Sequence, residues 1–126
     1  MRLLLDTHVF VWATTLTSSS SPKADEALAD PANEIFVSAV SAYEIEYKRA
    51  RAPDLQKMPF DLDDAVRLQG LVWLPMTAAH GAVAARLPPH HRDPWDRILV
   101  AQAMLEGLQL VTLDQKLPRY GVPILW

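Results

Sequence analysis

The sequence contains no cysteine, and it has no long hydrophobic run. The absence of cysteine excludes a disulfide framework, a thiolate-held zinc or iron–sulfur site and a cysteine nucleophile. No apolar run approaches the roughly 20 residues that cross a bilayer. The apolar stretch after Arg2 ends at Asp6, well short of a signal-peptide core of about 7–15 residues. We therefore expect a protein of the cytoplasm that does not enter a membrane.

The sequence also lacks a strong excess of charge of either sign. Twelve basic and 15 acidic side chains give a net charge of −3, which by itself argues mildly against a nucleic-acid partner. If four carboxylates bind a cation, 11 acidic side chains remain against 12 basic ones, a balance of +1. Overall charge therefore does not decide whether the partner is a nucleic acid.

What the chain does have is a globular composition. Hydrophobic residues make up 50% and charged residues 21% of its 126 residues, which argues against disorder. A chain of this length can bury roughly two-thirds of its unfolded surface. We expect one domain over residues 1–126.

Short apolar runs alternate with helical patterns along the chain. The runs predict strands at residues 2–5, 34–37, 71–74, 108–112 and 122–125, with a Ser/Thr-rich loop at 14–21. Ser21-Pro22, Asp61, Thr77 and Asp93-Pro94 are typical helix starts, and Gly107 is a typical helix end. This alternation predicts an α/β fold whose parallel sheet has helices on both faces. Functional sites in such folds form beyond the carboxyl ends of the strands.

Acidic side chains follow several of the predicted strands. Asp6 comes directly after the first strand, Glu44 lies in the helix after the second, and Asp114 follows the fourth. Asp93 and Asp96 open the helix that starts at Pro94, on neighbouring positions of its surface. In a parallel sheet these acids share one edge. An oxygen-only set without cysteine suits Mg²⁺ or Mn²⁺.

Each acid also has a purely structural interpretation. Ser41 and Glu44 have the spacing of a capping box, and Asp93 is a plausible helix cap. Glu44 with Lys48, and Asp93 with Arg97, have the spacing of ordinary helix ion pairs. Capping explains the positions one by one, but it does not require distant segments to meet. The metal hypothesis therefore depends on the whole set.

Four segments that contain these acids resemble the motifs of a known family. The segments are residues 3–8 (LLLDTH), 37–45 (VSAVSAYEI), 91–103 (HRDPWDRILVAQA) and 110–114 (LVTLD). They are similar, in the same order, to the four motifs of PIN-domain ribonucleases, and more closely to those of VapC-type toxins of bacterial toxin–antitoxin pairs. The ending at residues 120–126 (YGVPILW) is similar to that group as well.

The resemblance implies a three-layer, Rossmann-like PIN domain with a parallel sheet in the order 3-2-1-4-5. It implies a Mg²⁺- or Mn²⁺-dependent endoribonuclease that hydrolyses RNA with metal-activated water, commonly on a structured RNA such as tRNA. It also implies a homodimer that is inhibited by a cognate antitoxin. The segment at residues 50–55 departs from relatives that carry a glycine-containing turn there, which bears on substrate choice rather than on the chemistry.

The resemblance also implies roles for individual residues. The four catalytic acids fall on Asp6, Glu44, Asp96 and Asp114, with the metal held by Asp6, Asp96 and Asp114. Supporting roles fall on Asp93, Thr112 and Thr7. Basic side chains near the motifs are candidates to contact RNA: Arg97, Arg92, Lys116 and Lys48. We expect His90 and His91 to serve the structure of their loop, and the apolar side chains of Val9, Phe10, Ile45 and Tyr47 to face a second copy or an antitoxin.

Three other functions match the sequence less completely. A protein of the same fold could bind RNA or another protein without catalysis, although all four acids are present. A phosphorylatable receiver domain needs an acidic pair after the first strand, where Asp6 is followed by Thr7, and a phosphate-accepting Asp after the third, which is followed by Pro75. A haloacid-dehalogenase-type phosphatase needs a second Asp at the position of His8.

Overall fold

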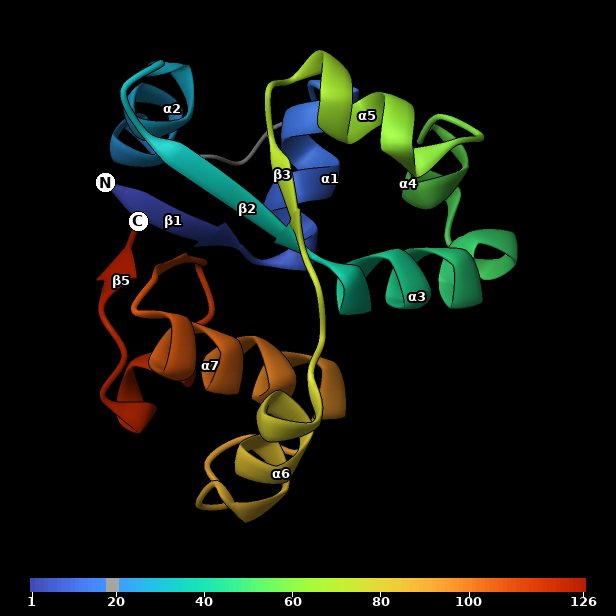
Figure 1. Ribbon diagram of the computed structural model, residues 1–126. Coiled ribbons are helices and arrows are strands. Elements are labelled where there is room, and N and C mark those ends of the chain that lie inside the picture. Colours follow the sequence, from blue (N-terminus) through green and yellow to red (C-terminus); the bar gives the residue numbers. More distant parts are fainter. Residues whose placement is uncertain (18–20) are drawn as a thin grey trace.

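The computed structural model describes residues 1–17 and 21–126. Five parallel strands form one sheet in the order β3-β2-β1-β4-β5, as predicted (Figure 1). The central strand β1 pairs Leu4 with Phe36 on one side and with Leu110 on the other. The strands are β1 (Arg2–Leu5), β2 (Glu34–Ser38), β3 (Val72–Leu74), β4 (Gln109–Val111) and β5 (Ile124–Leu125).

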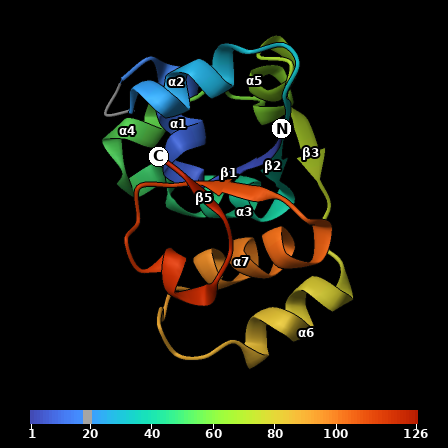
Figure 2. The ribbon, with the colours of Figure 1, turned by 90° about the vertical axis from the view of Figure 1, so that its left-hand side faces the viewer.

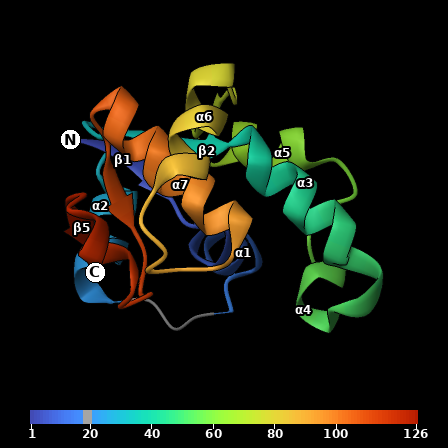
Figure 3. The same ribbon diagram turned by 90° about the horizontal axis from the view of Figure 1, so that it is seen from below.

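Helices cover both faces of the sheet, which gives three layers (Figure 2). One face carries α1 (Thr7–Thr15), α2 (Pro22–Ala29), α4 (Pro53–Gln56) and α5 (Leu62–Leu68). The other carries α6 (Ala78–Arg86), α7 (Pro94–Glu106) and the 3₁₀ turn η2 (Leu117–Tyr120). Helix α3 (Ala39–Lys48) continues from the end of β2 and is followed by the 3₁₀ turn η1 (Arg49–Arg51). Figure 3 views the molecule from the side of α6 and α7.

Each face of the sheet has its own hydrophobic core. Leu3 and Leu5 of β1 face the core that contains Phe10, whereas Leu4 faces the core that contains Leu99. All three leucines are fully buried, as expected for a parallel strand covered on both sides. The centre of the sheet is therefore a rigid support for the residues that follow β1 and β4.

Most of the predicted helix boundaries are confirmed. The side chains of Ser21, Asp61, Thr77 and Asp93 each accept a backbone N–H at a helix start. Gly107 ends α7 with φ 66°, in the left-handed region that glycine adopts without strain. Helix α1 extends through Thr15 into the predicted loop, and residues 18–20 of that loop lie outside the described residues. Helix α4 and turn η2 were not predicted.

The structure contradicts one alternative interpretation of Glu44 and one expectation about apolar side chains. Helix α3 is capped by Ser38, whose Oγ accepts the Val40 N–H at 3.1 Å, so Ser41 and Glu44 do not form a capping box. Val9, Phe10 and Ile45 are buried in the core instead of facing a partner, because each packs against the sheet face that holds Leu3 and Leu5.

Among the described residues, no helix combines the length and hydropathy that a membrane span requires.

Candidate metal centre

Three of the predicted acids meet in one pocket at the carboxyl edge of the sheet. Asp6 follows β1, Asp114 follows β4, and Asp96 lies in the first turn of α7. Together they line a pocket of about 490 Å³, whose other walls include the apolar side chains of Val9 and Trp12. The starts of α1, α3 and α7 gather at this edge (Figure 1). The parallel topology thus brings together acids that are more than 100 positions apart in the sequence.

Asp6 is buried and held on both of its carboxylate oxygens. Its Oδ1 accepts the His8 backbone N–H at 3.0 Å as the cap of α1, and its Oδ2 accepts the Thr112 hydroxyl at 2.6 Å. Burial alone would raise the pKa of Asp6, but the donors from His8 and Thr112 outweigh it and keep the pKa below its ordinary value. Asp6 is therefore a fixed, ionised carboxylate.

Asp96 has the opposite electrostatic environment. Burial, followed by repulsion from Asp6 and Asp93, raises its pKa to about 7. Its carboxylate lies close enough to other negative groups that ionisation is costly without a cation. Neighbouring carboxylates whose pKa values are driven apart mark a functional site more often than a structural one.

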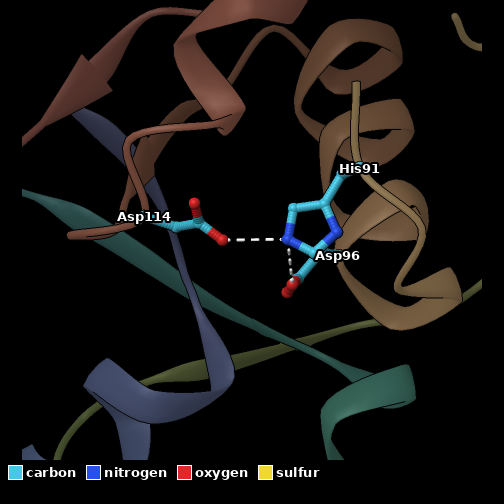
Figure 4. Close-up of side chains that lie close together, drawn as sticks. All are labelled: His91, Asp96 and Asp114. Carbon is cyan, nitrogen blue, oxygen red and sulfur yellow. Dashed lines mark hydrogen bonds and ion pairs between the residues drawn. The ribbon is translucent and has the colours of Figure 1, made fainter. Parts of the chain in front are cut away.

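Asp114 reaches the pocket from the loop after β4. Its backbone N–H donates to Thr112 Oγ at 3.0 Å, and its Oδ1 accepts the Lys116 N–H at 2.9 Å. Its other oxygen, Oδ2, lies 2.9 Å from His91 Nε2, which is also 3.2 Å from Asp96 Oδ2 (Figure 4). Thr112 therefore links Asp114 to Asp6, and His91 links Asp114 to Asp96.

Glu44 lies beside this pocket rather than in it. It lines a neighbouring cavity of about 160 Å³ that shares His8 and Trp12 with the first. Its Oε2 accepts Lys48 Nζ at 2.7 Å, whereas its buried Oε1 has no hydrogen-bond partner among the described residues. A buried carboxylate oxygen without a donor is costly, so this atom favours a bound water or cation.

These residues fit a hard divalent cation. The donors are carboxylate oxygens from separate elements, with a raised pKa at Asp96 and an orphaned oxygen on Glu44. Mg²⁺ and Mn²⁺ prefer such oxygen ligands. Among the described residues, the His91, Asp96 and Asp114 side chains also bring potential ligand atoms within 4.8 Å of one another.

The supporting residues have distinct places. Thr112 contacts two of the acids directly, as described above. Asp93 caps α7 by accepting the Trp95 N–H at 2.9 Å, and its charge contributes to the raised pKa of Asp96. Thr7 is turned to Ser41, with 2.8 Å between the two hydroxyl oxygens, so it joins α1 to α3.

The four basic candidates for RNA contact differ in what their side chains already bind. Arg97 directs its guanidinium into the 84–91 segment, where it donates to four backbone carbonyl oxygens, including those of Leu87 and His91. Lys48 pairs with Glu44 and lies 4.8 Å from the Trp95 ring centre. Arg92 and Lys116 are exposed next to the acids in the sequence. Of the four, only Arg92 and Lys116 make no side-chain hydrogen bond or ion pair within residues 1–17 and 21–126.

Two histidines take part in the site. The sequence placed His8 within reach of it, and it left phosphate contact by His91 as the less favoured alternative to a role in the loop. His91 contacts Asp96 and Asp114, instead of serving only its loop, and His8 Nδ1 lies 3.5 Å from Asp6 Oδ1. Hydrogen bonding to Asp6 raises the pKa of His8. Each histidine stands two positions from a motif aspartate, and that spacing was the available signal.

Comparison with known proteins gives consistent results. The PIN domain family model matches residues 3–123. Ribonuclease VapC22 of Mycobacterium tuberculosis is 30% identical over 127 residues, covering 96% of this chain and 93% of that protein.

Solved structures agree on the fold. The Rickettsia felis VapBC2 structure, bound to a DNA fragment from its promoter, has a chain with TM-score 0.71 and 19% identity, covering 98% of this chain and 97% of its own. M. tuberculosis VapC20, described as a sarcin–ricin loop cleaving toxin, has TM-score 0.68 and 16% identity, with 95% of both chains covered. From the family model, the VapC22 relationship and the shared fold, we conclude that this chain belongs to the PIN-domain family and is a VapC homologue.

Proposed function

We propose that this protein is a metal-dependent endoribonuclease of the VapC type, the toxin of a toxin–antitoxin pair. One observation carries the proposal: Asp6, Asp96 and Asp114, from three distant segments, line a single pocket. Helix capping alone would not require this convergence. The proposed cofactor is Mg²⁺ or Mn²⁺, held by these three acids, with Glu44 next to them.

The bound cation would supply a water of lowered pKa and would offset charge at the scissile phosphate. The side chains have separate tasks around it. Asp6 is fixed by Thr112 and the α1 backbone, so it presents an ionised oxygen in a constant position. Glu44 Oε1, which is buried and lacks a donor among the described residues, would orient a water molecule beside the pocket. Arg92 and Lys116, both exposed, attract the RNA backbone.

The names of the relatives support the substrate and the partner. VapC22 is named a ribonuclease, VapC20 a toxin that cleaves the sarcin–ricin loop, and the R. felis structure holds VapB with VapC. By analogy, we propose an RNA substrate, with a structured RNA such as tRNA as the first to test, and a cognate antitoxin. Such a substrate would place the activity in the cytoplasm.

We also propose a homodimer that uses an aromatic ledge, defined as Tyr43, Tyr47 and Trp95. The two tyrosines are about 60% exposed, and their stacked rings have centroids 5.9 Å apart. The ring centroid of Trp95 lies 6.0–6.3 Å from those of both tyrosines. Large exposed aromatic side chains are enriched at protein interfaces. A second copy seated here would lie beside Glu44 and Asp96. Loss of dimer mass on light scattering in Tyr43→Ser/Tyr47→Ser would support this surface, and an unchanged mass would reject it.

A ribonuclease assay tests the central proposal. Wild type, Asp6→Asn and the surface control Asp25→Asn would be incubated with structured RNA in Mg²⁺, Mn²⁺ or EDTA. We expect cleavage by wild type and Asp25→Asn with metal, products with 5′-phosphate ends, and no cleavage by Asp6→Asn or in EDTA. Cleavage that survives both EDTA and Asp6→Asn would reject the mechanism. RNA binding without cleavage under any condition would favour the non-catalytic alternative.

A further inference from the structure

His91 is held in one orientation by contacts outside the acid pocket. Its backbone N–H donates to Tyr120 Oη at 2.9 Å, and its ring Nδ1 lies 3.0 Å from the Asp93 backbone nitrogen. Arg97 donates to the His91 carbonyl at 3.2 Å. The side chain is only 13% exposed. The ring is therefore fixed by the backbone on one edge, and its other edge is directed at the acids.

This arrangement determines the protonation of the ring nitrogens. The Asp93 backbone nitrogen can only donate, so His91 Nδ1 must accept and cannot carry a proton. The proton of the neutral ring then resides on Nε2, which faces Asp114 Oδ2 at 2.9 Å and Asp96 Oδ2 at 3.2 Å. In this orientation Nε2 is a donor to both carboxylates and has no lone pair for a metal ion.

The two carboxylates that His91 contacts are among those that would hold the proposed cation. The other oxygen of Asp114 already accepts the Lys116 N–H. Asp114 Oδ2 is consequently the oxygen available on the pocket side, and it is the one to which Nε2–H donates. Figure 4 shows the ring edge directed into the gap between the two carboxylates.

We propose that His91 is a positioning residue that acts as an internal stand-in for the cation. Its Nε2–H bridges Asp96 and Asp114 and holds the two carboxylates facing each other. A cation held by the same two carboxylates would compete with this donor. His91 is thus not a metal ligand, although its distance to the acids alone would allow that role. The inference rests on the proposed metal site.

The test is Mn²⁺ binding by RNA-free protein, measured by calorimetry. We expect His91→Phe, which fills the space without a donor, to bind Mn²⁺ about tenfold tighter than wild type, the effect of one lost competing hydrogen bond. His91→Gln, which can place an N–H near the same point, should stay within about twofold of wild type. His90→Gln, an exposed neighbour, is the matched control and should not differ.

The other outcomes are equally decisive. Mn²⁺ binding that weakens about tenfold or more in His91→Phe would identify a metal ligand and overturn the inference, and equal affinity in all variants would overturn it too. Absence of Mn²⁺ binding in wild type and His91→Phe alike would remove the proposed metal site itself.

Nitrogen NMR of the wild-type ring checks the inference without any substitution. We expect the Nε2–H tautomer both in the metal-free protein and with Mg²⁺. A change to the Nδ1–H tautomer on adding Mg²⁺ would overturn the inference, because it would free Nε2 to coordinate the ion.

Discussion

The two ends of α7 each carry a histidine–carboxylate pair, and they are built alike. At the first turn, His91 contacts Asp96 and Asp114; at the last residue, His80 Nε2 lies 3.0 Å from Glu106 Oε1. Both rings accept a backbone N–H on Nδ1, from Asp93 and from Thr77 respectively. Over the ten residues from Asp96 to Glu106, the helix rises about 15 Å, so the pairs are separate.

The difference lies in how many acids each histidine meets. His80 has one partner, the half-exposed Glu106, and completes the capping box of α6. His91 has two, and Asp6 repels one of them from across the same pocket. A histidine–carboxylate pair therefore does not mark a functional site by itself. An excess of carboxylates over nearby donors is the better signal, because a bound cation or a bound proton has to balance it.

The largest expected difference between the two ends is in catalysis. Asp96→Asn should lower metal-dependent RNA cleavage by about 100-fold or more, because it removes a proposed ligand and a charge from the site. The matched change at the other end, Glu106→Gln, should leave cleavage within about twofold. Initial rates on a labelled RNA at fixed Mg²⁺ measure both. Equal losses in the two variants would erase the distinction.

The change expected at His91 is in Mn²⁺ affinity, whereas the change expected at His80 is in stability. His80→Ala should lower the free energy of unfolding by about 2–3 kcal/mol, because it leaves a cavity and removes the capping box. Its Mn²⁺ affinity should stay unchanged. Urea denaturation and calorimetry give the two numbers. A His80→Ala protein that folds with wild-type stability would show that this end of α7 is not structural.

The raised pKa of Asp96 predicts that stability depends on pH through the first turn of α7 and not through its last turn. The folded protein holds this proton up to about pH 7, whereas the unfolded chain loses it near pH 4. In EDTA, stability should therefore fall as pH rises from about 4 to 7. At pH 8, Asp96→Asn should be more stable than wild type by about 1–2 kcal/mol, and Glu106→Gln should not be. Thermal melts across pH test this, and a lower melting temperature for Asp96→Asn would contradict it.

The smallest expected effect concerns the surface around the first turn of α7. Arg92→Ala should weaken RNA binding about threefold and reduce its salt dependence, because one exposed cation is lost. Arg97→Ala should instead destabilise the protein by about 1–3 kcal/mol, because its donors hold the 84–91 segment. Filter binding at several salt concentrations and melting curves separate the two roles. If Arg97→Ala weakened RNA binding and Arg92→Ala destabilised the protein, Arg97 would be the residue that contacts RNA.

Much of the fold was predictable because its signals are local. Each helix cap at Ser21, Asp61, Thr77 and Asp93 is a short-range hydrogen bond, and the fully apolar Leu3–Leu5 run is typical of a strand buried on both faces. The strand order came from the resemblance rather than from local patterns. The short helix α4 was missed because four residues show no periodicity.

The site was predictable in its acids but not in its connections. Asp6, Asp96 and Asp114 could be nominated from their places after strands and at a helix start. The bridge from Thr112 to Asp6 and the contact of His91 with two acids depend on how distant segments pack, as does the use of Arg97 as a loop anchor. These contacts follow neither the helix period nor the strand period, so a single sequence carries no periodic signal for them.

The position of β4 beside β1 has a consequence for when the pocket comes into existence. β1 is the first strand to be synthesised, yet its Asp6 acquires the Thr112 donor and the Asp114 neighbour only when the segment after β4 has been made. A growing chain that stops short of this segment has a hydrophobic half-sheet and unmatched acids. The ribosome therefore has to synthesise the chain through Thr112 and Asp114 before the pocket can assemble, so translation itself delays its appearance.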